Sequence, residues 1–271
     1  MTAAPWLQTD LVKGQTERDS FMPERDTASQ PFHDLISAFG LLTRLPMPST
    51  SRHRPEAAWC WPIIGGMVAV LSVMPALFII TLGAPPASAA IMLLMLSILL
   101  TGAMHEDGLA DTADGLFGGW TPERRLEIMK DSHIGSYGTL ALITVQLALW
   151  SSYTALLLVA NWQAIIAAMV LSRPPMAVLM SVLPNARRSG LSSTVGQPAR
   201  WAALVSVILS VLIAGFLLGD FATLVTMVTF VTLATVAIGV LAKRKIGGQT
   251  GDILGTAQQC ALLCAVMAAQ M

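Results

Sequence analysis

Long apolar runs are the dominant pattern of this chain, and they predict helices that cross a membrane. Each run holds about 18–22 residues, the length that an α-helix needs to cross a hydrocarbon core of about 30 Å. Backbone amides without partners are so costly in lipid that only helices or closed barrels span it, and runs of this length exclude a barrel. The runs cover residues 61–82, 87–104, 139–160, 162–183, 201–219, 221–242 and 253–271. The sequence therefore predicts an all-α fold, a polytopic integral membrane helical bundle of about seven transmembrane helices.

Three shorter patterns lie outside these runs. Residues 1–31 are polar and lack the apolar stretch of a secretory signal, which predicts a disordered cytoplasmic tail before a membrane-embedded domain over 32–271. That domain begins with an amphipathic stretch over 32–46, which is too short to span and predicts an N-terminal interfacial helix. Thr121 followed by Pro122 predicts the start of a short cytoplasmic helix that ends near Asp131.

The charged residues are few and unevenly placed. They make up 12% of the chain, half of the roughly 25% that is usual for soluble domains, which excludes a disordered protein, an ordinary cytosolic enzyme and a nucleic-acid binder with a basic face. Apart from Arg173 within the fourth run, Lys and Arg precede the first run or follow the second, fourth and sixth. Because cytoplasmic connections carry the excess of Lys and Arg, the N-terminus and the chemistry are predicted to be cytoplasmic, with the C-terminus outside.

Four carboxylates occur within nine residues directly after the second run. Asp107, Asp111 and Asp114 stand at i, i+4 and i+7, within a sector of about 60° on one helix face. These like charges repel one another, and a divalent cation such as Mg²⁺ or Mn²⁺ removes that conflict. A solvated helix end with Asp-Gly turn chemistry is the alternative, and it does not account for three aligned acids. His105 and Glu106 point away from this face. Either could be a general base or support the metal from outside its ligand shell, and either could equally be an interfacial cap.

Further polar residues near the cytoplasmic face suit an anionic substrate. The connection 243–252 is rich in glycine, and Gly248 and Thr250 could present backbone amides to a phosphate at a helix start. Asp252 could cap the last run or supply another metal ligand. Arg173, followed by two prolines that permit a broken helix, and Arg187 could offset phosphate charge, although Arg187 could equally be a membrane-surface anchor. Together these residues favour phosphoryl transfer.

Five motifs give this chemistry a family context. They are HEDGLADTADGL at 105–116, RLEIMKDS through GSYG over 125–138, TRLP at 43–46, AR with GL over 186–191, and GGQTGD at 247–252. From about residue 32 to the C-terminus, the chain resembles the cobalamin-5′-phosphate synthases, also called adenosylcobinamide-GDP ribazoletransferases. The family usually has Arg at position 133, where this chain has His133, so a phosphate contact at this position is not carried over from the resemblance.

The resemblance implies a Mg²⁺-dependent transferase of the cell inner membrane that acts late in cobalamin biosynthesis. Its substrates would be GDP-activated adenosylcobinamide (GDP-cobinamide) and α-ribazole or α-ribazole 5′-phosphate. A ribose hydroxyl would attack the phosphorus on the cobinamide arm, and GMP would leave. The implied metal ligands are Asp107, Asp111, Asp114 and Asp252. The candidates for phosphate binding are Arg173, Arg187, Lys130, Gly248 and Thr250, and those for general base are Glu106 and His105.

Two rival functions fit the sequence less well. The signature of a CDP-alcohol phosphotransferase has Ala-Arg soon after Asp-Gly, whereas Leu-Ala-Asp follows Asp107-Gly108 here. An ion-coupled transporter would place acids near the bilayer midplane, whereas these acids cluster at one edge. Besides the two substrates, the lipid bilayer is the expected partner. Binding to nucleic acid is not expected. The sequence leaves open a homo-oligomer or an association with other cobalamin-pathway enzymes.

Overall fold

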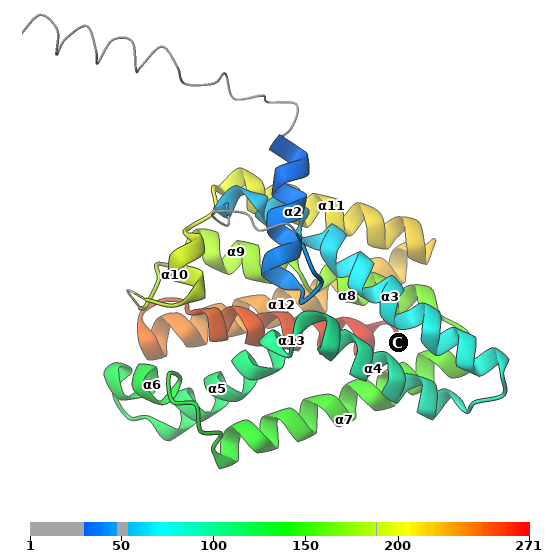
Figure 1. The fold of residues 1–271 in the computed structure, drawn as a ribbon, viewed down its shortest axis with the longest axis horizontal. Coiled ribbons are helices and arrows are strands. Elements are labelled where there is room, and N and C mark those ends of the chain that lie inside the picture. The colour runs from blue at the N-terminus through cyan, green and yellow to red at the C-terminus, as the bar shows by residue number, and fades with distance from the viewer. Residues whose placement is uncertain (1–29, 48–53, 188) are drawn as a thin grey trace, which may run out of the picture. The chain divides into compact units, whose positions relative to one another are not determined.

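The structure is a computed structural model (Figure 1) that describes residues 30–47, 54–187 and 189–271. The chain divides into two units, residues 1–33 and 34–271, and the second contains the helical bundle. The predicted tail lies outside the described residues except for Gln30 and Pro31, which already belong to α2 (Gln30–Leu42). The other elements are η1 (Pro55–Cys60), α3 (Trp61–Thr81), α4 (Pro86–Thr101), α5 (Met104–Gly118), α6 (Pro122–Ile128), α7 (Ser136–Leu158), α8 (Trp162–Leu171), α9 (Pro174–Val182), α10 (Leu191–Val195), α11 (Arg200–Leu218), α12 (Phe221–Ile246) and α13 (Gly251–Ala268).

The described residues confirm the all-α, polytopic bundle. Six stretches of helix are long and apolar enough to cross a membrane, and α4 with α5 makes a seventh if that bent pair is one span. The β pairing found in the described ranges is an isolated bridge between Asn185 and Gln249. The predicted short helix is α6, which starts as expected because Thr121 Oγ1 accepts the Arg124 amide at 3.3 Å.

The second predicted span, residues 87–104, is shorter in the structure. α4 ends at Thr101, and α5 leaves it at an angle of 88°. Gly102 and Ala103 make the turn with φ of 67° and 58°. This left-handed backbone is ordinary for glycine but costs about 1–2 kcal/mol in an alanine. The acidic cluster of α5 therefore does not continue along the axis of α4.

The fourth predicted span forms the centre of the bundle. Of its most apolar window, 89% is buried inside the protein, against 17% for α12. Neighbouring helices α3, α11 and α13 pack around it. It consists of α8 and α9, which are separated at Ser172 and Arg173 because the two prolines that follow have no amide hydrogen for the helical ladder. The predicted break at the prolines is thus present.

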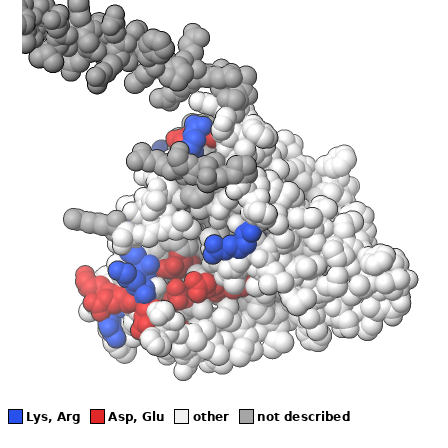
Figure 2. Space-filling view, in the orientation of Figure 1, with Lys and Arg blue, Asp and Glu red and all other residues white. Residues whose placement is uncertain are grey.

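Charged side chains gather at one end of the second unit. In Figure 2, red and blue residues cluster where Figure 1 shows α5, α6 and the connections near α10, with a few more beside α2. The surface around the C-terminus is uncharged in this view. The two ends of the helices thus differ in charge as predicted, and the side of the membrane on which each lies stays a prediction.

Candidate functional site

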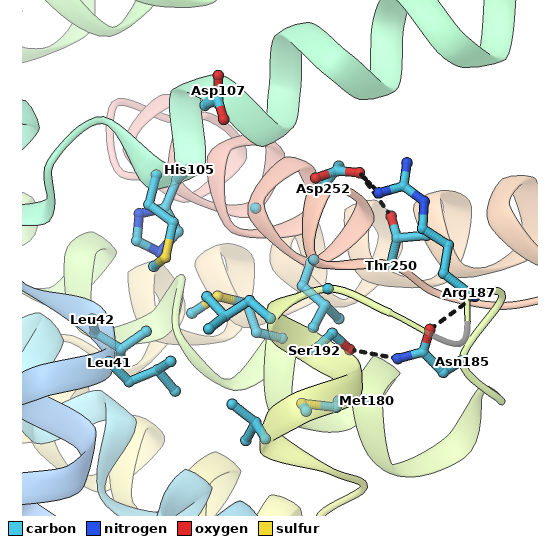
Figure 3. A pocket seen from close by; sticks show the side chains of 18 of the residues that line it. Leu41, Leu42, His105, Asp107, Met180, Asn185, Arg187, Ser192, Thr250 and Asp252 are labelled. Carbon is cyan, nitrogen blue, oxygen red and sulfur yellow. Dashed lines mark hydrogen bonds and ion pairs between the residues drawn. The ribbon is translucent and has the colours of Figure 1, made fainter. Parts of the chain in front are cut away.

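A pocket at the charged end combines several of the predicted residues. It lies between α5, α13 and the connection that follows α9, and its cavity volume is about 270 Å³, close to the lower end of the range of small-molecule sites. Figure 3 shows Asp252, Thr250 and Arg187 together on one side and Leu41 and Leu42 on the opposite side. The polar wall is formed by Asp107, Asn185, Arg187, Thr250 and Asp252.

Close packing of α5 against α13 brings acids from distant parts of the chain together. A Cβ atom on Gly108 would lie 2.9 Å from the carbonyl oxygen of Asp252, and one on Gly255 would lie 3.2 Å from the α5 backbone. Only glycine permits this approach without a shift. As a result, the α5 residues Asp107 and Asp111 lie near Asp252, although more than 140 positions separate them in the sequence.

Arg187 supplies positive charge to the polar wall. Its Nη1 lies 3.0 Å from Asp252 Oδ2, and its Nη2 donates to the carbonyl oxygen of Leu126 at 3.3 Å. Asp111 is close enough to interact electrostatically with Asp107, Asp252 and Arg187. One guanidinium among three carboxylates leaves an excess of negative charge.

The donor chemistry of this wall suits Mg²⁺, because carboxylates are hard oxygen ligands. Within the described ranges, no three His, Cys, Asp or Glu side chains stand close enough to hold an ion as they are. Asp252 is paired with Arg187, while Asp107 is exposed, and no hydrogen bond or ion pair of its carboxylate is found among the described residues. An ion bound here would have to draw Asp107, Asp111 and Asp252 together.

Asp114 has a different environment from the other aspartates. Its Oδ2 accepts the amide of Gly135 at 2.7 Å and its Oδ1 accepts that of Gly138 at 2.9 Å. These amides belong to the N-cap and first turn of α7, so the buried carboxylate caps a helix from outside and opposes its dipole. A Cβ atom on either glycine would collide with the Asp114 carboxylate. This geometry favours a positioning role over metal binding.

His105 and Arg173 form a buried pair beside the pocket. Arg173 Nη1 lies 3.0 Å from His105 Nε2, and both residues are only 2% exposed. Because a guanidinium has no acceptor, Nε2 must accept this hydrogen bond, and the neutral ring carries its proton on Nδ1. Neither ring nitrogen is then free to take a proton from a substrate. Arg173 does not line the pocket and reaches it only through His105, which does.

Glu106 turns away from the pocket toward α13. Its Oε1 accepts the Gln259 side-chain amide at 2.8 Å, while its Oε2 is buried without a partner among the described residues. Glu106 is not among the residues that line the pocket. Its position therefore does not favour the predicted role of general base.

The glycine-rich connection before α13 is used mainly for packing. A Cβ atom on Gly248 would collide with the carbonyl oxygen of Pro184, so this glycine contacts the connection after α9 rather than open space. The Gln249 amide donates to Pro184 at 2.9 Å, and the Ala186 amide donates to Gln249 at 2.8 Å. Thr250 lines the pocket and caps α13, because its Oγ1 accepts an amide of the first turn at 3.3 Å.

The segment between α6 and α7 lies apart from the pocket lining. Lys130 is exposed, and it is not among the residues that line the pocket. His133 Nδ1 lies 2.7 Å from Asp131 Oδ1. This hydrogen bond raises the pKa of His133 and lowers the pKa of Asp131, although both side chains are exposed. Residues 129–135 are thus not among the residues that line the pocket.

Sequence reasoning did not single out Gly190, Asn185 or Ser192, all of which line the pocket. Gly190 has a φ of +112°, and a Cβ atom on Gly251 would meet nothing within 4 Å, so these glycines leave backbone open to a ligand. Asn185 Nδ2 donates to Ser192 Oγ at 3.2 Å, which links the two ends of the connection. Gly190 lies in the 186–191 motif, but Asn185 and Ser192 carried no signal.

Comparisons with known proteins identify the family of this chain. The profile of the family described as cobalamin-5-phosphate synthase matches residues 34–270. The adenosylcobinamide-GDP ribazoletransferase of Brucella ovis is 38% identical over 252 residues, which cover 86% of this chain and 95% of the relative. Proteins of the same name from Brucella canis and Brucella melitensis are 37% identical with the same coverage. No solved structure matches the chain. These names support a transferase with cobalamin-5′-phosphate synthase activity, and the chain belongs to the cobalamin-5-phosphate synthase family.

Proposed function

We propose that this protein transfers the adenosylcobinamide phosphate of GDP-cobinamide to α-ribazole or α-ribazole 5′-phosphate. A ribose hydroxyl attacks the phosphorus attached to the cobinamide arm, a new P–O bond forms and the bond to the GMP phosphate breaks. The hydroxyl loses its proton and GMP leaves with the electron pair of the broken bond. The product is adenosylcobalamin or its 5′-phosphate.

The observation that carries this proposal is the polar wall of the pocket. It places Asp107, Asp252 and Arg187 from three separate segments around one cavity. Carboxylates that can hold a cation, beside an arginine that can bind phosphate oxygens, are the recurring parts of phosphoryl transfer sites. The names of the family and of its relatives supply the substrate class.

Within this wall, Asp107, Asp111 and Asp252 would hold Mg²⁺, which offsets the charge of the diphosphate when bound. Arg187 is the guanidinium placed to contact phosphate oxygens, and its hydrogen bond to the Leu126 carbonyl fixes its direction. Thr250 and Gly251 line the pocket at the N-terminus of α13, and the dipole of a helix N-terminus favours an anion. The positions of Arg173, Lys130 and Gly248 do not favour direct phosphate contacts.

The active pocket is proposed to face the cytoplasm from the inner membrane. The residues that line it lie at the end of the bundle where Lys and Arg gather, and such connections are cytoplasmic in most membrane proteins. Both nucleotide-derived substrates would then reach the site without crossing the bilayer.

Turnover by the full-length protein in liposomes tests this function. With GDP-cobinamide, α-ribazole and Mg²⁺, we expect GMP and a corrinoid product in equal amounts, and no product after EDTA treatment. Asp111→Asn should lower kcat by about a hundredfold or more, the scale of removing one strong electrostatic contact to a transition state. The variant should remain inserted in the membrane.

Asp220→Asn is the matched control, because Asp220 is an exposed aspartate that caps α12 and asparagine caps helices equally well. This variant should keep the wild-type rate. Full turnover without a divalent cation, or equal losses in both variants, would contradict the mechanism.

A further inference from the structure

The pocket has an apolar wall that the proposed phosphoryl transfer does not use. Figure 3 shows Leu41, Leu42 and Met180 on one side of the cavity, away from Arg187 and Asp252. Together with the side chains that accompany them, these apolar residues come from α2, α3, α9, α10 and α13, so the wall is assembled from five separate helices. Its members are Leu41, Leu42, Trp61, Met176, Met180, Leu191, Val195 and Leu254.

This wall is well suited to a planar aromatic ring. Trp61, Met176 and Met180 are 3%, 4% and 2% exposed, so they are held firmly by their neighbours. The two methionines stand at i and i+4 on α9 and therefore on one helix face. Thioether sulfurs make favourable contacts with aromatic rings and adapt to their shape.

Trp61 adds a hydrogen-bond donor without an acceptor. Its Nε1 is buried and has no hydrogen-bond partner among the described residues. An indole N–H can only donate, and buried donors are normally paired. Trp61 lines the pocket, so a ligand ring with an unsubstituted nitrogen would supply the acceptor that this donor lacks once the indole turns toward the cavity.

We propose that the apolar wall binds the base of the nucleoside acceptor, an inference that rests on the proposed function. The base of α-ribazole is a benzimidazole, a planar apolar ring system with one unsubstituted nitrogen. With the base against Trp61 and Met180, the ribose extends toward the polar wall. The guanine of GDP-cobinamide fits less well, because its edge carries several donors and acceptors. Among the described side chains of the apolar wall, only the Trp61 N–H could form a hydrogen bond with the guanine edge.

Binding to the unmodified protein provides the first test. Isothermal titration of the detergent-solubilised full-length chain with α-ribazole alone requires neither GDP-cobinamide nor Mg²⁺. We expect α-ribazole to bind at least about tenfold more tightly than guanosine, because guanine would leave polar groups unpaired on this wall. Equal affinities, or tighter binding of guanosine, would overturn the proposal.

Variants provide the second test. Trp61→Phe keeps the ring but removes the N–H, and Met180→Ala removes the thioether. Each should raise the KM for α-ribazole by about tenfold and leave the KM for GDP-cobinamide unchanged. Met169→Ala is the control, because Met169 is 2% exposed in the same span but does not line the pocket, and it should change neither KM.

The outcomes separate this inference from the proposed function. If the protein catalyses the transfer but both variants keep the wild-type KM for α-ribazole, the binding wall is wrong and the function stands. If no transfer occurs but α-ribazole binds and Trp61→Phe weakens that binding, the wall is right and the function is wrong. Loss of a co-purifying phospholipid from the variants, with unchanged nucleoside binding, would assign the wall to an acyl chain instead.

Discussion

At the scale of single residues, Asp107, Asp111 and Asp114 share a spacing but not an environment. Asp107 lines the pocket and Asp111 lies within electrostatic reach of Asp252, whereas Asp114 binds two backbone amides of α7. A carboxylate with both oxygens occupied in this way holds α7 in place. The same residue type in the same motif therefore serves two purposes.

Asp114→Asn should therefore reduce stability more than chemistry. The side-chain amide can accept with one oxygen only, which leaves one amide of α7 unpaired, a loss of about 1–3 kcal/mol. We expect a melting temperature several degrees below that of the wild type in detergent. Asp111→Asn should melt like the wild type but lose turnover. If Asp114→Asn melts normally and instead loses its response to Mg²⁺, Asp114 belongs among the metal ligands.

At the scale of elements, the crossing of α5 and α13 determines the geometry of the polar wall. Gly108 allows the α5 backbone to approach the Asp252 carbonyl closely. Thr256 Oγ1 donates across the same crossing to the Gly108 carbonyl at 3.0 Å. Any residue that separates these helices separates the acids that they carry.

Gly108→Ala should accordingly impair catalysis, although alanine is a better helix former than glycine. Its Cβ atom would lie 2.9 Å from the Asp252 oxygen and force α5 away from α13. A displacement of about 1 Å in a reacting group can lower the rate by about a hundredfold. Gly118→Ala in the same helix is the control, since the nearest atom would be 3.7 Å from its Cβ. Equal turnover in the two variants would show that the crossing of α5 and α13 tolerates the added Cβ atom without displacing the acids.

The sequence predicted the elements better than their contacts. Apolar run length located the spans because crossing a bilayer imposes a minimum length, and the two prolines predicted the break between α8 and α9. The capping of α7 by Asp114 joins residues 21 and 24 positions apart, and no periodicity reports such a contact. The packing of Gly248 against Pro184 was not predictable for the same reason, because the two residues are distant in the sequence.

At the scale of the whole molecule, the described helix connections at one end of the bundle carry no Lys or Arg, whereas the other end is rich in charge and contains the pocket. Charged connections on one side restrain the orientation of every span, so the pocket and the C-terminus should face opposite compartments. The uneven placement of charge at the two ends of the bundle would therefore determine the topology. It would also determine the compartment from which the proposed substrates enter the pocket.

Cysteine labelling in cells tests the orientation. In a background without the native Cys60, Cys260 and Cys264, Ser132→Cys places a thiol in the exposed segment before α7 and Met271→Cys places one at the C-terminus. A membrane-impermeant maleimide should label Met271→Cys in spheroplasts and Ser132→Cys only after the membrane is opened. The reverse pattern would invert the proposed topology.

The enclosed central span also has a consequence for biogenesis. An arginine at the middle of a nascent helix raises the free energy of membrane insertion by about 2.5–3.5 kcal/mol. Arg173 emerges from the ribosome 68 residues after His105, its hydrogen-bond partner in the finished bundle. His105 is therefore synthesised before Arg173, so the order of synthesis makes the acceptor available when the costliest segment inserts.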